Sequence, residues 1–484
     1  MTPNERYKKL EQHLKQENPV LLDVLELYKV LDKIGYRTGV LSKQETFSAQ
    51  ISWWPLISVL GTFSAGKSSF INQYVGQDIQ SVGNQAVDDK FTVICYGKNK
   101  EVMTLPGLAL DADPRFPFFE ISKEIEKVDA GEGSKVDNYL QLKTVNSEQV
   151  KGKILIDSPG FDADDQRSST LKITNHIIEM SDLVLVFFDA RHPEPGAMRD
   201  TLEHLVGNVI RRNDASKVLF ILNQIDTAAK EDNPEEVISA WHRAIAQQGL
   251  VSGNFFAIYN EEAAIEISDP QLQERFKRKK DEDLKRILMR MERVSIERSY
   301  RITDDVAKLS EGLFNDTLPK LKQAIAGWRR KTLMWDGVVF GSLVVVVGIA
   351  AFQFEFVAQF LAQTIDWVLA STMNILFAMT SVFALLLAIH YYIRNSVCKR
   401  EVKRWQSLDT MVAKALAYNN RFWRGMFPKT PRGWGRRTVK GVSSIQNQSK
   451  VLIQKLNDQF ADPSGHLTAQ IEKGTPLKTT SEKD

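Results

Sequence analysis

The sequence predicts an α/β domain with a mostly parallel sheet, flanked by helices and joined to a pair of membrane-spanning helices. Between Pro55 and about residue 260, short apolar runs alternate with helical stretches, which is the pattern of βαβ units. Two later segments are long and apolar enough to cross a bilayer as helices. At 484 residues the chain is long for one compact domain, so two or three structural units are expected.

The composition gives no sign of several classes of protein. The 63 basic residues nearly balance the 60 acidic ones, so the net charge of +3 does not indicate a nucleic-acid partner, and none is expected. Cys95 and Cys398 lie far apart and outside any CxxC pattern, so neither a disulfide framework nor a zinc site is predicted. The N-terminal residues lack the apolar stretch of a secretory signal, and the α/β domain is expected to stay in the cytoplasm.

The expected elements divide the chain into five segments. These are N-terminal helices that pack with a helical domain (1–50), the α/β domain (51–260), a charged helical stalk (261–334), a hydrophobic hairpin (335–395) and a helical, basic C-terminal region with a disordered tail (396–484). Six strands are expected in the α/β domain, at 56–60, 91–96, 153–156, 183–188, 218–222 and 255–259. The insertion at about 100–150 is given no function.

The hairpin is predicted from two apolar segments, Gly337–Phe354 and Ile375–Ile393, each close to the roughly 20 residues that a spanning helix needs. A pair of buried core helices is the alternative. Basic residues precede the first segment at 329–331 and follow the second at 394–404, whereas 355–373 contains no Lys or Arg. The positive-inside rule then predicts a two-pass integral membrane protein with both termini in the cytoplasm. In a bacterium this would be the inner membrane.

A phosphate-binding loop is predicted where Gly61-Thr-Phe-Ser-Ala-Gly-Lys-Ser-Ser fits the pattern G-x4-G-K-[ST] between an apolar strand and a helical pattern. Backbone N–H groups of such a loop point at the phosphates. Lys67 would supply positive charge to the β- and γ-phosphates, and the Ser68 hydroxyl would bind Mg²⁺. The nucleotide-binding residues predicted here are Gly61, Ser64, Ala65, Gly66, Lys67, Ser68 and Ser69.

Two further motifs follow predicted strands. Asp157, in Asp157-Ser-Pro-Gly, is expected to hold Mg²⁺ through water, while the Gly160 N–H senses the γ-phosphate. Asn223-Gln-Ile-Asp226 stands where GTPases have N-K-x-D, and Asp226 keeps the carboxylate that accepts hydrogen bonds from guanine. Gln224 replaces the lysine whose aliphatic stem covers the base, and Asn223, Gln224 and Asp226 join the predicted nucleotide-binding residues. GTP is therefore the expected substrate, with ATP left open.

The residue after the Asp157 motif differs from that of small GTPases. Phe161 occupies the place where they have a glutamine that orients the attacking water, and an apolar side chain cannot do this. Catalysis is expected to depend on loop groups that a partner molecule completes.

These residues resemble the dynamin superfamily, and within it the EHD family of membrane-remodelling ATPases. The likeness covers about residues 50–260, beginning with the phosphate loop. It continues through Gly76-Gln-Asp, Val82-Gly-Asn-Gln-Ala-Val-Asp-Asp-Lys-Phe, Leu105-Pro-Gly-Leu-Ala-Leu, Asp113-Pro-Arg-Phe-Pro-Phe, Asp157-Ser-Pro-Gly-Phe, Phe188-Asp-Ala and Leu222-Asn-Gln-Ile-Asp.

The resemblance implies a P-loop NTPase of the dynamin type with an α-helical bundle. It implies Mg²⁺-dependent hydrolysis of the β–γ phosphoanhydride and homo-oligomers that meet through their G domains on a lipid bilayer. Ser64 matches the loop serine near the leaving phosphate oxygens, and joins Lys67 and Gly160 as the expected catalytic residues. EHD relatives prefer adenine nucleotides.

Three features depart from that family. Val87 and Asp88 stand where switch threonines are expected, and Thr92 is nearby but out of register. No EH domain or EF-hand loop follows. The hydrophobic hairpin replaces the short membrane-binding tip of EHD proteins, as in mitofusin-type and bacterial dynamin-like proteins.

Two functions are predicted from these features. The first is a mechanochemical enzyme that couples nucleotide-driven self-assembly to membrane remodelling, fission, fusion or tethering. The second is a membrane-anchored switch or scaffold that hydrolyses nucleotide slowly and recruits partners. A transporter is disfavoured, because two spanning segments without an internal repeat do not match transporter folds.

Overall fold

The computed structural model describes most of the chain as two compact units. The described residues are 3–17, 20–82, 90–113, 116, 118–119, 121–128, 131–160, 168–191, 217–227, 234–247, 253–265, 267, 269–421, 424, 426–428 and 430–460. The sheet unit comprises Arg6–Pro19 and Ala49–Ile302, and the helical unit comprises Met1–Glu5, Val20–Ser48 and Thr303–Asp484. Val87, Asp88, Phe161 and the tail expected to be disordered lie outside the described residues.

The sheet unit contains a mixed sheet in the order β3-β4-β2-β5-β1-β6-β7-β8. Its described strands are β1 (Leu56–Gly61), β2 (Phe91–Tyr96), β3 (Met103–Pro106), β4 (Leu140–Val145), β5 (Ile154–Asp157), β6 (Leu183–Asp189), β7 (Val218–Asn223) and β8 (Asn254–Ala257). Only the β2–β5 and β3–β4 pairs among these strands are antiparallel. The six expected strands are present, and the sheet is mostly parallel. The prediction missed β3 and β4, which lie in the insertion.

Helices cover both faces of this sheet. They are α3 (Lys67–Val75), α4 (Leu108–Asp111), α5 (Ile121–Val128), α6 (Ser168–Met180), α8 (Pro234–Gln247) and the part of α9 (Pro270–Gly312) up to residue 302. Successive side chains of β6 point to opposite faces, so Leu185 and Phe187 pack with α3 and α9, whereas Val186 and Phe188 pack with α6 and α8. Burial on both faces explains why β1, β6 and β7 are continuous apolar runs.

The helical unit joins segments from distant parts of the sequence. Its helices are α2 (Val20–Thr38), α10 (Leu318–Gln353), α11 (Glu355–Leu369), α12 (Thr372–Gln406), α13 (Thr410–Asn419) and α14 (Arg436–Phe460). α2 packs along α14, with Leu31, Ile34, Ile445 and Leu456 buried. A further helix, α1 (Pro3–Glu17), precedes α2 in the chain.

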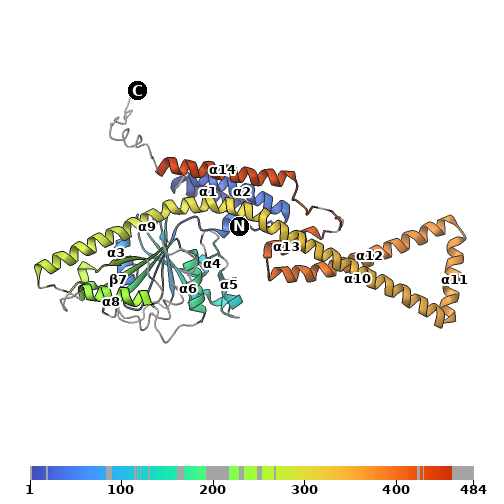
Figure 1. Cartoon of the computed structure of the whole chain (residues 1–484), viewed down its shortest axis with the longest axis horizontal. Coiled ribbons are helices and arrows are strands. Elements are labelled where there is room, and N and C mark those ends of the chain that lie inside the picture. The colour runs from blue at the N-terminus through green and yellow to red at the C-terminus, as the bar shows by residue number, and fades with distance from the viewer. Residues whose placement is uncertain are drawn as a thin grey trace, which may run out of the picture. The chain divides into compact units, whose positions relative to one another are not determined.

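α10, α11 and α12 form the predicted hairpin, and Figure 1 shows α11 running across the far ends of the other two. A five-residue π-helix, Leu313–Thr317, joins α9 to α10, so a continuous helix runs from Pro270 to Gln353. This helix and α12 are the two described helices that are long and apolar enough to cross a membrane. In their most apolar windows only 6% and 0% of the residues are buried. A core helix of a soluble protein would be mostly buried in such a window, and these two helices are not.

Polar and aromatic contacts hold the two arms together at the base of the hairpin. The Trp328 Nε1–H donates to the carbonyl of Arg394 at 3.2 Å, and the Arg394 guanidinium lies 5.4 Å from the centre of the Trp328 ring. The Lys331 ammonium pairs with the buried Glu401 carboxylate. Asp336 Oδ2 and His390 Nδ1 are 2.8 Å apart. The contacts of Trp328 and Lys331 thus lie outside the apolar segments, whereas His390 lies near the end of the second segment.

Candidate nucleotide-binding site

The predicted phosphate loop connects the end of β1 to the start of α3, and its shape requires glycine at two positions. A Cβ added at Gly61 would lie 2.4 Å from the carbonyl oxygen of Phe187, and one added at Gly66 would lie 2.1 Å from Asn223 Nδ2. Gly66 also has φ +83°, in the left-handed region that favours glycine. The loop therefore lies directly against β6 and the end of β7.

Lys67 is buried at the centre of this loop. Its Nζ donates to the carbonyl oxygens of Gly61 at 3.0 Å and Thr62 at 2.9 Å. Burial lowers the pKa of Lys67 to about 8, although the nearby Asp157 carboxylate acts in the opposite direction. The ammonium is thus held by weak backbone acceptors, which phosphate oxygens could replace with negative charge.

Asp157 lies beside the loop because β5 runs parallel to β1. It is paired in register with Val59, two residues before the loop begins, and its carboxylate is buried. Ser68, in the first turn of α3, is half-buried. A carboxylate and a hydroxyl are the hard oxygen ligands that Mg²⁺ uses together with water and substrate phosphates, so these residues fit that ion. A Cβ at Gly160 would lie 3.0 Å from Phe63 Cα, so this backbone also approaches the loop.

Asn223 and Gln224 hold the loop from the other side. Asn223 Nδ2 donates to the Ala65 carbonyl at 2.9 Å, and Gln224 Nε2 donates to the Ser64 carbonyl at 2.7 Å. Gln224 has φ +65°, which is unusual for a residue with a side chain. From sequence, Gln224 is predicted to bind the nucleotide, in place of a lysine whose stem would cover the base. In the structure its amide links the base-recognition motif to the phosphate loop.

Asp226 lies close to the same strand end, three residues after Asn223. Its carboxylate is buried, and Oδ2 accepts a hydrogen bond from the backbone N–H of Ile265 at 2.9 Å. Burial raises the pKa of Asp226, and the Ile265 N–H acts in the opposite direction. The carboxylate is thus held in place where a nucleotide base could meet it.

The predicted residues are brought together at one edge of the sheet, where β1, β5 and β7 end. This is the usual ligand-binding edge of a parallel α/β sheet. The residues gathered there are Gly61, Ser64, Ala65, Gly66, Lys67, Ser68, Ser69, Asp157, Gly160, Asn223, Gln224 and Asp226.

Two other residues change the sequence-based description of this edge. Thr92 is a buried residue of β2, paired in register with Asp157, and its hydroxyl accepts from Gln141 Nε2 at 2.7 Å. It is therefore part of the sheet, as the second residue of β2. The prediction also missed Gln80, whose Nε2 donates to Asp157 Oδ2 at 2.5 Å.

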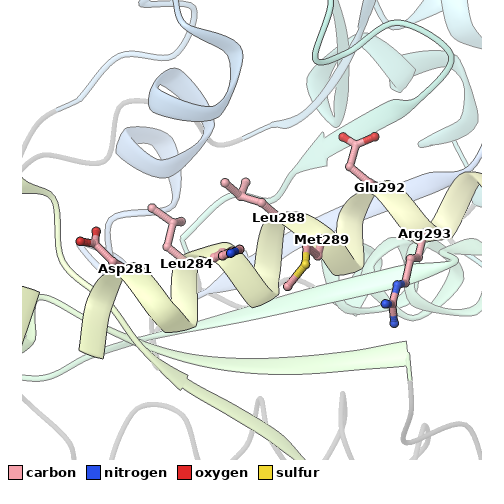
Figure 2. Close-up of a pocket in the computed structure, with 7 residues that line it drawn as sticks. Asp281, Leu284, Leu288, Met289, Glu292 and Arg293 are labelled. Atoms are coloured by element: carbon pink, nitrogen blue, oxygen red, sulfur yellow. The ribbon is translucent and has the colours of Figure 1, made fainter. Parts of the chain in front are cut away.

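A separate shallow groove of about 540 Å³ lies along α9 (Figure 2). Its lining comes from that helix alone: Asp281, Leu284, Lys285, Leu288, Met289, Glu292 and Arg293. Leu284 and Leu288 also pack against the core beneath α3. Figure 2 shows the charged side chains spread along the helix, with no common point where they could meet a ligand. The edge of the sheet where β1, β5 and β7 end is the better candidate site.

The comparison with known families identifies the domain that contains this site. Residues 57–225 match the model of the Dynamin family. The chain has a dynamin-family G domain. The matched range begins in β1, includes the phosphate loop and Asp157, and ends one residue before Asp226. The resemblance predicted from the motifs is confirmed for this part of the chain.

Relatives of the G domain include EH domain-containing proteins. EH domain-containing protein 2 of Rattus norvegicus is 26% identical over 198 residues, which are 40% of this chain and 34% of that protein. EH domain-containing protein 1 of Homo sapiens is 25% identical over 179 residues, which are 36% of this chain and 31% of that protein. The chain thus spans about a third of the length of these curated relatives.

Solved structures of an oligomerised bacterial dynamin pair, described as sensing and tethering membranes at long range, are also similar. One of these chains is 16% identical, with a TM-score of 0.31 over 97% of this chain and 76% of the other. A second is 14% identical with a TM-score of 0.32. Scores of this size do not establish a common arrangement of the whole chain.

Proposed function

We propose that this chain is a membrane-integral, dynamin-like nucleoside triphosphatase that couples self-assembly to the remodelling, fission, fusion or tethering of membranes. One observation supports this above all others. A dynamin-family phosphate loop with a buried Lys67 occurs in the same chain as a helical hairpin whose apolar side chains are exposed.

Each site residue has its own role in the cleavage of the β–γ phosphoanhydride. Loop amides and the Lys67 ammonium bind the β- and γ-phosphates, and the Ser64 side chain lies near the leaving oxygens. The Gly160 N–H faces the γ-phosphate. Ser68 and Asp157 would hold Mg²⁺, which neutralises charge on the phosphate oxygens when it is bound.

The proposed substrate is GTP, with ATP as the alternative, and Asp226 distinguishes them. Its carboxylate can accept hydrogen bonds from guanine N1 and N2, whereas adenine offers no matching donors there. Asp226→Asn should weaken binding of a GTP analogue by about 10- to 100-fold, because a charged hydrogen bond is lost. Calorimetric titration of GTP and ATP analogues measures this. Strong ATP-analogue binding that is unchanged in the variant would assign the chain to adenine nucleotides.

The hairpin is the proposed membrane anchor. Gly337–Phe354 and Ile375–Ile393 are each about 27 Å long as helices, close to the thickness of a bilayer core. Cations on both arms outside these segments favour cytoplasmic termini, with α11 on the far side. The membrane would be the inner one in a bacterium. The stalk (261–334) would connect this hairpin to the G domain, while the helices of 1–50 and 396–484 complete the cytoplasmic part.

Reconstitution into liposomes tests the coupling between assembly and hydrolysis. Turnover per molecule should rise with the surface density of the protein, because neighbouring G domains complete each other's sites. Lys67→Ala should abolish turnover and leave the protein in the membrane, since the hairpin does not depend on that side chain. Turnover that stays constant over all densities would contradict self-assembly as the trigger.

The membrane-anchored switch or scaffold is kept as a second candidate, because of Phe161 and of Val87 and Asp88, which stand where residues that position water are expected. It has the same nucleotide site but slow hydrolysis. Tight binding of nucleotide, combined with slow turnover at every density, would favour this second function.

A further inference from the structure

Gln80 connects the carboxylate of Asp157, at the end of β5, to Lys143 on β4, two strands away in the sheet. Its Nε2 donates to Asp157 Oδ2 at 2.5 Å, while its Oε1 accepts from Lys143 Nζ at 2.6 Å. Lys143 Nζ also donates to the carbonyl of Ile79 at 2.9 Å. Gln80 and Asp157 are both buried, so bulk water does not compete strongly for these bonds.

The backbone at Gln80 is held by α3, the helix that begins with Lys67 and Ser68. Asn72 Oδ1 accepts from the N–H groups of Ile79 at 3.1 Å and Gln80 at 2.9 Å, and Asn72 Nδ2 donates to the Gln80 carbonyl at 2.8 Å. These bonds fix Gln80 relative to the phosphate loop.

The chemistry of the two neighbours sets the orientation of the amide. Lys143 has only donors to offer, so it must meet the amide oxygen. An ionised carboxylate has only acceptors, so it must meet the amide nitrogen. The bond from Nε2 then restricts the rotation of the Asp157 carboxylate. The Lys143 charge polarises the amide and strengthens that bond.

We propose that Gln80, supported by Lys143, is a positioning residue for the magnesium site: it holds the Asp157 carboxylate oriented toward the ion that accompanies the triphosphate. This inference rests on the proposed nucleotide-binding function. Partners of this kind typically change metal affinity by about 10- to 100-fold when they are removed, without contacting the metal themselves.

The test measures how Mg²⁺ tightens the binding of a fluorescent, non-hydrolysable GTP analogue, with the ATP analogue in parallel, to the full-length protein. In Gln80→Leu the Mg²⁺ concentration for half-maximal tightening should rise by about tenfold or more. Affinity in EDTA should stay at the wild-type value. Gln80→Glu should have a larger effect, because it replaces a donor with a second carboxylate. Lys143→Met should shift the midpoint in the same direction by less.

Matched substitutions on the nearby surface serve as controls. Gln77→Leu alters an exposed glutamine that bonds to Asn146, and Lys151→Met alters an exposed lysine that pairs with Glu148. Both should keep the wild-type Mg²⁺ midpoint. If Gln80→Leu does not fold, Lys143→Met is compared with Lys151→Met.

The possible results separate this inference from the proposed function. A Mg²⁺ midpoint in Gln80→Leu equal to that of Gln77→Leu would overturn the inference. So would an equal loss of affinity with Mg²⁺ and in EDTA, because Gln80 would then support the loop as a whole. A wild-type protein that binds neither analogue would instead refute the proposed function.

Discussion

At the scale of single residues, the site contains a lysine, Lys67, whose side chain is buried even without a substrate. The phosphate loop encloses the Lys67 side chain, and Nζ donates its hydrogen bonds to backbone carbonyls of that loop. Removing the ammonium from water without a full counter-charge disfavours its protonated form, which explains the pKa of about 8. Bound phosphates would reverse this effect, since their negative charge favours the ammonium.

Nucleotide affinity should therefore fall as the pH rises above 8. In the free protein Lys67 loses its proton near that pH, and phosphate binding must then restore it. By linkage, affinity should be about tenfold lower at pH 9 than at pH 7. Titration of a fluorescent nucleotide at pH 7, 8 and 9 measures the change. Lys67→Met should have a flat profile over this range, and a flat profile in the wild type would contradict the assignment.

At the scale of elements, an ion pair with a buried carboxylate joins the two arms at the base of the hairpin, outside the apolar segments. Glu401 on α12 is buried, and its ion-pair partner is the half-exposed Lys331 on α10. A carboxylate in this position needs its cation, because a buried charge without a partner is costly. This pair should hold the two arms in one register.

Lys331→Met should lower the free energy of unfolding by about 1–3 kcal/mol, because it leaves Glu401 buried without this cation. The estimate is below that for a fully buried pair, since Lys331 is partly exposed to water. Thermal unfolding in detergent measures the loss. Lys322→Met, at an exposed position on the same helix, is the matched control, and an equal loss in both variants would refute the role of the pair.

The elements also explain what the sequence could predict. β1, β6 and β7 are buried on both faces, so their apolar runs are visible without knowledge of the fold. β3 is mostly exposed and β4 alternates with polar residues, so neither gives such a run. The residues of the phosphate loop were predictable because they are contiguous in the sequence. Gln80 was not, because its partner Asp157 is 77 positions away and only the sheet brings them together.

At the scale of the whole molecule, two spanning segments require that both ends of the chain lie on the same side of the membrane. α11 would then be the part of the chain that faces the other side. The cations that flank the hairpin would set the direction of insertion, because Lys and Arg near spanning segments favour the cytoplasmic side.

A labelling experiment tests this topology. In a background without the native thiols (Cys95→Ser, Cys398→Ser), Gln363→Cys on α11 should react with a membrane-impermeant maleimide from the non-cytoplasmic side. Ser444→Cys, exposed on α14, should react after the membrane is opened. Labelling of both positions from the same side would contradict a two-pass hairpin.

The packing of α2 along α14 has a consequence for how the protein is made. About 400 residues separate these helices, so a ribosome working at about 5–20 residues per second needs about 20–80 s to produce the second after the first. Both apolar segments of the hairpin leave the ribosome during this interval. In the proposed membrane-integral protein, the apolar face of α2 must therefore be kept from aggregating while the hairpin enters the bilayer. Chaperones that shield nascent helices should bind this face in that period.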